Sequence, residues 1–327
     1  MVRYLSGLIT NSQTSDITPG KALMNSTAPS SSSVRPRDGN PWKTTTKADH
    51  VSIGTNSLFV SVSGPPRHPT EPIIIIFPGS NAGCDSWQPV ATEIQGFARV
   101  LLYDRSGLGQ SETGTSRDTG AVAAAELTSL LRAIDVPGPY ILVAHSYGGC
   151  VAREFLQLHQ KDVVGMVFSE TGTETKCQHA EEQYRTRVLG DSPLSVIRGE
   201  SAFCGQRKGH EGAGDAGNID DTGKSRDGPE QSTEHSRMLE AMEKLDEELK
   251  REQLQLSKKG KFRNVPNCGH NVHLVRPDVV VEEVRWVLEH MEPYHVRQSA
   301  QQVTAPRTQE HENSGILQRL RRRILLR

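Results

Sequence analysis

Short apolar runs separated by polar, turn-forming residues occupy the middle of the chain. Runs such as Ile73–Phe77, Arg99–Tyr103 and Tyr140–Ala144 are apolar without alternation, which is typical of strands buried on both faces. Around Gly54, apolar and polar residues alternate, which predicts a hairpin. The predicted strands are Val51–Thr55, Leu58–Val62, Ile73–Phe77, Arg99–Tyr103, Tyr140–Ala144, Val163–Phe168, Leu194–Ile197 and Lys261–Val265.

Helical periodicity fills the intervals between several of these strands. In Thr119–Ile134, apolar residues recur with the spacing of one helix face. The other predicted helices are Cys150–His159, Glu234–Ser257 and Pro277–Met291. Strands that alternate with helices imply right-handed crossovers and a mostly parallel sheet with helices on both faces. The predicted fold class is therefore α/β, and ligands of such sheets bind at the carboxyl ends of the strands.

Polar segments flank and interrupt this ordered part. Because Asn25–Arg37 is rich in Ser and Pro, we expect a disordered N-terminal segment over residues 1–48. The folded domain is expected over residues 49–295, with a polar, disordered insertion at 205–233. Residues 296–327 read as a flexible basic tail. The alternative for its five Arg after Gly315 is an amphipathic helix that contacts a membrane or a partner.

Charge and cysteine content narrow the class of protein. Lys+Arg 38 against Asp+Glu 39 gives a net charge of −1, so no general attraction to nucleic acid or acidic membrane is expected. The five cysteines are scattered and fit neither a disulfide framework nor a zinc pattern. We expect no metal, no cofactor and a reducing, cytoplasmic location. A mitochondrial location stays open because no acidic residue precedes Asp16.

A serine stands between a predicted strand and a predicted helix. One residue, His145, separates Ser146 from the end of the predicted strand Tyr140–Ala144. A tight strand-to-helix turn would push the serine hydroxyl out of the sheet edge, and it requires small residues two positions before and two after. Ala144 and Gly148 meet this requirement. The sequence therefore predicts a nucleophilic serine at position 146.

In this motif, VAHSYGG, the chain resembles the nucleophile elbow of the α/β-hydrolase family. FPGS (Phe77–Ser80) is similar to the family's His-Gly segment, with Pro in place of His. YDRSGLGQS (Tyr103–Ser111) is similar to its YDRxGxGxS segment, and NCGHNVHLVRPDVV (Asn267–Val280) to the stretch around its catalytic His. The resemblance covers about Val51–Met291 and implies the α/β-hydrolase fold. The short interval between Glu170 and Leu194 favours a small or absent cap.

A serine hydroxyl needs a base to take its proton. The resemblance favours His270, because the family pattern G-H-x-x-x-L matches Gly269–Leu274. His273 is a nearby competitor that spacing alone leaves open. His145 is expected to anchor the elbow, since alternation along the strand points it away from the catalytic side.

A carboxylate should orient the base, and in this fold it lies between the serine and the histidine in sequence. Glu170 and Glu200 both fit that order, and both follow predicted strands. Glu200 follows the strand that more often carries the acid in the family. Glu170 stands where relatives often have an Asp, so it is placed slightly ahead while Glu200 stays open.

The oxyanion of an acyl-transfer reaction needs preorganised N–H donors. The backbone N–H groups of Tyr147 and Ser80 are the candidates. Asp104 and Arg105, within the YDRxGxGxS segment, are expected to brace the turn near the elbow and to take no part in the chemistry.

Together these residues predict a serine hydrolase of the carboxylic ester type. It would cleave an ester, thioester or lactone of a small molecule through an acyl-enzyme. The alternative is a non-catalytic binding or scaffolding protein with the same fold. It is motivated by Pro78, by the long tails expected to be disordered, and by the fact that Glu200 does not fit the family's usual spacing for the acid. The sequence leaves the oligomeric state open.

Overall fold

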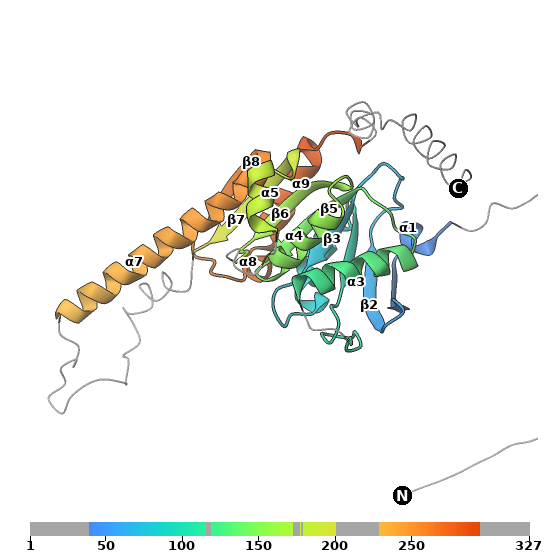
Figure 1. Cartoon of the computed structure of the whole chain (residues 1–327), viewed down its shortest axis with the longest axis horizontal. Helices are drawn as coiled ribbons and strands as arrows, with labels where there is room; N and C mark the ends of the chain where they lie inside the picture. Colours follow the sequence, from blue (N-terminus) through green and yellow to red (C-terminus); the bar gives the residue numbers. More distant parts are fainter. Residues whose placement is uncertain (1–38, 116–118, 173–176, 178, 201–228, 295–327) are drawn as a thin grey trace, which may run out of the picture. The chain divides into compact units, whose positions relative to one another are not determined.

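In the computed structural model, residues 39–115, 119–172, 177, 179–200 and 229–294 are described, with side chains from 237 onward in the last range. Their strands form one sheet in the order β1-β2-β4-β3-β5-β6-β7-β8 (Figure 1). The strands are β1 (Lys47–Ser52), β2 (Ser57–Ser63), β3 (Ile73–Phe77), β4 (Arg99–Tyr103), β5 (Tyr140–His145), β6 (Val163–Ser169), β7 (Gly190–Gly199) and β8 (Ser257–Val265). β1 and β2 pair antiparallel, β2 also pairs antiparallel with β4, and the remaining pairs are parallel. The predicted mostly parallel sheet is confirmed.

Helices cover both faces of this sheet (Figure 1). Those of the described residues are α1 (Pro41–Thr44), α2 (Gln88–Ile94), α3 (Gly120–Ala133), α4 (Gly148–Leu158), α5 (Ala180–Thr186), α7 (Pro229–Glu252), α8 (Val272–Val275) and α9 (Pro277–His290), with short 3-10 turns η1 (Cys84–Trp87) and η3 (Gln253–Leu256). Ile73, Ile75 and Phe77 of β3 pack with residues of α3 and α4, whereas Ile74 and Ile76 pack with those of α2 and α9. This alternation is why β3 has no polar position.

Each predicted strand and helix overlaps an observed one, but the first strand was placed too late, since β1 is Lys47–Ser52 and not Val51–Thr55, and α7 begins earlier than expected. β3 and β4 have the predicted bounds, and the helix expected at Glu234–Ser257 runs from Pro229 to Glu252 and continues into η3. Its first residues therefore lie inside the segment 205–233 that was expected to be disordered. The rest of that segment, and the tail 296–327, lie outside the described residues.

The N-terminal boundary of the folded domain lies earlier than residue 49, which corrects the prediction. Asn40 caps α1 through its side chain, which accepts a hydrogen bond from the Trp42 N–H, and the Trp42 side chain is buried. The buried Arg99 of β4 donates to the carbonyls of Trp42 (3.0 Å) and Thr45. Residues 40–48 are thus part of the domain because a core tryptophan and a buried guanidinium depend on them.

Between β6 and β7 the described residues hold one short helix, α5, in agreement with the expected small cap. Arg153 of α4 contacts α5: its Nε donates to Gln183 Oε1 at 2.9 Å. Leu189, which follows α5, belongs to the main hydrophobic core, since it is buried and its N–H donates to the Leu256 carbonyl. No helix in the described ranges is long and apolar enough to cross a membrane.

Candidate active site

Ser146 lies in a strained turn between β5 and α4. Its φ of +50° is in the left-handed region, which residues with a side chain rarely adopt. The turn is crowded: a Cβ added to Gly148 would lie 2.1 Å from the carbonyl oxygen of Phe77. A Cβ added to Gly149 would lie 2.6 Å from Cγ2 of Thr171. The close approach of the Phe77 backbone therefore requires a small residue at Gly148, as the elbow prediction assumed, whereas Gly149 leaves room for the Thr171 side chain.

His270 lies beside this turn, in the loop that follows β8. Nε2 of His145 donates to the His270 carbonyl at 2.9 Å, and the two ring centroids are 4.7 Å apart. Nδ1 of His270 lies 3.2 Å from Oε2 of Glu170. The His270 side chain is 52% exposed. With Nδ1 committed to the carboxylate, Nε2 is the ring nitrogen available for proton transfer.

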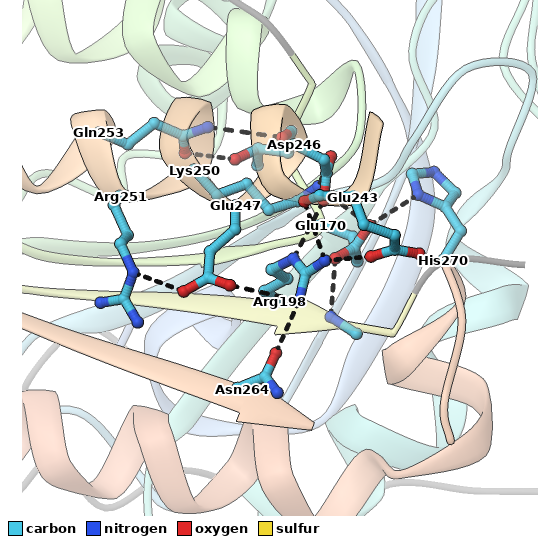
Figure 2. Close-up of polar contacts among 12 residues, drawn as sticks. Glu170, Arg198, Glu243, Asp246, Glu247, Lys250, Arg251, Gln253, Asn264 and His270 are labelled. Carbon is cyan, nitrogen blue, oxygen red and sulfur yellow. Dashed lines mark hydrogen bonds and ion pairs between the residues drawn. The ribbon is translucent and has the colours of Figure 1, made fainter. Parts of the chain in front are cut away.

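Glu170 is buried at the end of β6, with its side chain 5% exposed. Its own φ is +51°, a second left-handed non-glycine residue at this sheet edge. Oε1 accepts a hydrogen bond of 2.7 Å from the Gly199 N–H, and Oε2 faces both His270 and Nζ of Lys250, at 3.4 Å (Figure 2). A buried carboxylate requires such partners, because an unpaired charge is costly to remove from water.

Glu200, the other candidate acid, has a different position. Its Oε2 accepts a hydrogen bond of 2.6 Å from the backbone N–H of Asn267. Asn267 has a left-handed φ of +57° in the turn that leads to His270. The structure therefore brings Glu170 to the imidazole and uses Glu200 to hold the turn.

The competitor histidine His273 is buried in the core. Its ring stacks on Trp87 with centroids 4.5 Å apart and planes 13° apart. Burial, with the neighbouring His145 and His270, lowers the pKa of His273 to about 3. Burial likewise lowers the pKa of His145 to about 4, although its hydrogen bond to the His270 backbone opposes the shift. Both imidazoles are therefore neutral at neutral pH and serve as packing and anchoring groups.

The loop that carries Ser80 lies directly against the elbow. A Cβ added to Gly79 would lie 2.9 Å from Nδ1 of His145 and 3.3 Å from Cβ of Ser146. The buried Arg105 holds this loop with both ends of its guanidinium, donating to the carbonyls of Pro78 (2.6 Å) and Gly79 (2.7 Å). It thereby braces the loop at the point where Pro78 replaces the family's His.

The two candidate N–H donors belong to the residues that follow Ser146 and Gly79, which are in close contact. Tyr147 is the N-cap residue of α4, so its N–H is at the positive end of the helix. Ser80 is the exposed residue after Gly79. Asp104 fixes the adjacent segment, since its carboxylate accepts from the N–H groups of Cys84 (2.6 Å) and Gln110 (2.9 Å).

The sequence interpretation missed two contacts of this site, those of the Gly199 N–H and the Lys250 ammonium with Glu170. It expected Arg105 to brace the turn near the elbow, and the guanidinium donates to the neighbouring carbonyls of Pro78 and Gly79. Only Lys250 had a sequence signal: the charged residues Glu243, Asp246, Glu247 and Lys250 recur at the spacing of one helix face. In the described part of the chain, no group of three or more His, Cys, Asp or Glu side chains could hold a metal ion.

Comparison with known proteins agrees with this architecture. A family model described as the alpha/beta hydrolase fold matches residues 72–211. Over 322 residues the chain is 27% identical to a protein named probable transporter efuK from Hormonema carpetanum, covering 77% of this chain but only 44% of that protein. Over 321 residues it is 26% identical to an AB hydrolase superfamily protein from Gibberella zeae, covering 76% of this chain and 98% of the relative.

Among solved structures, the enol-lactonase from Burkholderia xenovorans LB400 superposes with a TM-score of 0.51 at 14% identity, over 74% of this chain and all (100%) of that one. At this identity the likeness concerns the fold alone. The family match, the relative of nearly equal extent and the strand order agree, and they support a hydrolase in general terms. The chain has the α/β-hydrolase fold.

Proposed function

We propose that the protein is a serine hydrolase that cleaves an ester, thioester or lactone of a small molecule through an acyl-enzyme. The observation that carries the proposal is the convergence of three sheet-edge residues. Ser146 follows β5 in a strained turn, Glu170 follows β6, and the loop after β8 brings Nδ1 of His270 to 3.2 Å from Glu170. This is the order and arrangement in which a serine, an acid and a histidine act as a unit.

In this reaction Ser146 attacks the substrate carbonyl while Nε2 of His270 takes the hydroxyl proton. Glu170 keeps the Nδ1 proton in place and stabilises the imidazolium that forms, because its Oε2 faces Nδ1. His270 then gives the proton to the leaving group. In the second half of the reaction it activates a water that releases the acid from Ser146.

The developing oxyanion would be bound by the backbone N–H groups of Tyr147 and Ser80. The tight contact between Gly79 and the elbow supports this role for the loop, and so does its bracing by Arg105. Because such donors act only if they are already in position, a loop held by two short hydrogen bonds suits the task.

Labelling with a fluorophosphonate probe tests the proposal. The wild-type chain should be labelled on Ser146, and Ser146→Ala should lose the label while remaining folded. Ser129→Ala, at a half-buried position of α3 where the hydroxyl only donates to the Ala125 carbonyl, is the matched control and should be labelled like the wild type. A series of activated esters of increasing acyl length would then define the preferred substrate.

A folded wild type that takes no label would refute the proposal. It would favour the alternative, a non-catalytic binding or scaffolding protein, for which the replacement of the family's His by Pro78 is the specific motive.

A further inference from the structure

Lys250, near the end of α7, places its ammonium group against the candidate triad acid. Nζ lies 3.4 Å from Oε2 of Glu170, the same oxygen that faces His270. The Lys250 side chain is 7% exposed, and Nζ also contacts Asp246 one turn earlier on the helix. A lysine buried to this degree in a helix that is otherwise strongly charged is held there by its partners.

Arg198 of β7 fixes the part of α7 that precedes Lys250 (Figure 2). Its side chain is 6% exposed and contacts Glu243, Asp246 (3.1 Å) and Glu247 (3.9 Å). Burial alone would lower the pKa of Arg198, but the hydrogen bond with Asp246 and the surrounding carboxylates raise it. The guanidinium of Arg198 thus binds the charged face of α7 to the sheet.

A second tie lies on the other side of Lys250. Oγ1 of Thr171, the residue after Glu170, donates to Oε1 of Gln253 at 2.6 Å. Nε2 of Gln253 donates back to the Thr171 carbonyl at 3.4 Å. Lys250 is therefore held between two anchors, and its position relative to Glu170 is fixed by both.

We propose that Lys250 is a positioning residue for the hydrolytic reaction: it orients the Glu170 carboxylate toward Nδ1 of His270 and moderates the negative charge that the imidazole experiences. The inference rests on the proposed function, because it gives Lys250 a role only through Glu170 and His270. A buried carboxylate paired with a cation that is itself held in place keeps one orientation, which a triad acid requires.

The pH dependence has a defined direction. The titratable groups that face Glu170 include Lys250 of α7, His145 of β5, and Cys268 and His270 of the loop after β8. A cation at Lys250 disfavours a second cation on His270. Removing it should make the imidazole easier to protonate, so the acid limb of kcat/KM should move to higher pH.

The test compares Lys250→Met with Lys250→Arg and with Lys244→Met, in the full chain. Lys244 lies on the same helix with its side chain 80% exposed, and it pairs with Glu248 only at 3.9 Å. With an activated ester as substrate, Lys250→Met should lower kcat/KM about tenfold at neutral pH. That is well below the about 10⁴-fold loss expected when a triad acid loses its charge. Its acid limb should also move to higher pH, whereas Lys250→Arg should retain most of the activity and Lys244→Met all of it.

Lys250→Gln keeps a polar group beside Glu170 and Asp246 and replaces Lys250→Met if the latter does not fold; the same shift is expected. A wild-type rate and pH profile in a folded Lys250→Met or Lys250→Gln would overturn the inference and leave the proposed function intact. An equal loss in the Met and Arg variants with an unmoved pH profile would also overturn it. A wild type that takes no fluorophosphonate label would instead refute the proposed function itself.

Discussion

The carboxylate of Glu170 lies 3.2 Å from Nδ1 of His270, although 100 positions separate the two residues in the sequence. Glu200 instead accepts a hydrogen bond from the backbone N–H of Asn267, 67 positions later, and so holds the turn that precedes His270. Both carboxylates leave the same edge of the sheet, at the ends of the neighbouring strands β6 and β7. The backbone of Glu170 is in the left-handed conformation, and its side chain points toward His270.

Glu170→Gln should therefore lower kcat by about 10²–10⁴-fold, because the amide cannot stabilise the imidazolium and can favour the wrong tautomer. Glu200→Gln should lower it by less than about tenfold, since the amide oxygen can still accept from the Asn267 N–H. Steady-state kinetics with an activated ester measures both. A larger loss in Glu200→Gln than in Glu170→Gln would contradict the assignment of the acid.

Gly148→Ala should destabilise the fold by about 3 kcal/mol, near the upper end of overpacking effects. The added Cβ would lie 2.1 Å from the Phe77 carbonyl oxygen and 2.7 Å from that of Pro78, and backbone atoms have little room to move. Urea unfolding measures the change. The control is Gly172→Ala, where an added Cβ meets nothing within 4 Å and the change should stay within about 0.5 kcal/mol. Equal stability of the two variants would show that the elbow is less crowded than described.

The buried histidines should make the fold less stable as the pH falls. In the unfolded chain His145 and His273 accept protons near pH 6.5, whereas in the folded protein burial lowers their pKa values to about 4 and about 3. Between about pH 6.5 and about pH 4 the unfolded state therefore binds more protons. The free energy of unfolding should fall as the pH drops through this window, by up to about 1.4 kcal/mol per pH unit for each histidine.

His273→Gln should reduce this dependence by about one proton, as measured by urea unfolding at several pH values from about 7 to about 4.5. The substitution of the exposed His68 by Gln is the control for the change in histidine number. An unchanged slope in His273→Gln would show that this imidazole becomes protonated in the folded state.

Arg105→Lys should lower kcat about tenfold with a smaller effect on KM. Lysine keeps the charge but cannot donate to two carbonyls with the fixed geometry of a guanidinium, so the Pro78–Ser80 loop would lose one tether. Loss of an oxyanion donor outright costs about 10²–10³-fold, and a loosened loop should cost less. Arg132→Lys, on the exposed surface of α3, is the control. A change in KM alone would place Arg105 in substrate binding.

The sequence predicted those elements whose own pattern determines their structure. β3 and β4 have the predicted bounds because each is an unbroken apolar run. α3 lies within one residue of its predicted bounds at each end because its apolar face is long enough to be periodic. The elbow could be predicted because strain at Ser146 requires small neighbours. α2 and α8 were missed because each spans too few residues to show a helical period.

What remained open depended on contacts between distant segments. The choice between Glu170 and Glu200 turns on the direction of each side chain at the sheet edge, which the order of residues does not contain. The choice between His270 and His273 likewise depends on a contact between distant segments, the stacking of the His273 ring on Trp87. Lys250 belongs to a charged helical face that would ordinarily point to solvent, and only the position of Arg198 shows that it faces the sheet.

The hydrogen bonds from Arg99 to the first residues of the folded domain limit how far the chain can be shortened at its N-terminal end. The buried guanidinium of this residue donates hydrogen bonds to the carbonyls of Trp42, Thr45 and Gly64. A polypeptide starting at residue 49 would keep the cation and remove two of these three acceptors, together with the buried indole of Trp42. Recombinant versions intended for crystallisation should therefore begin upstream of Asn40, since an earlier start keeps the carbonyl acceptors of the buried cation in the strand that leads to Asp104 and Arg105.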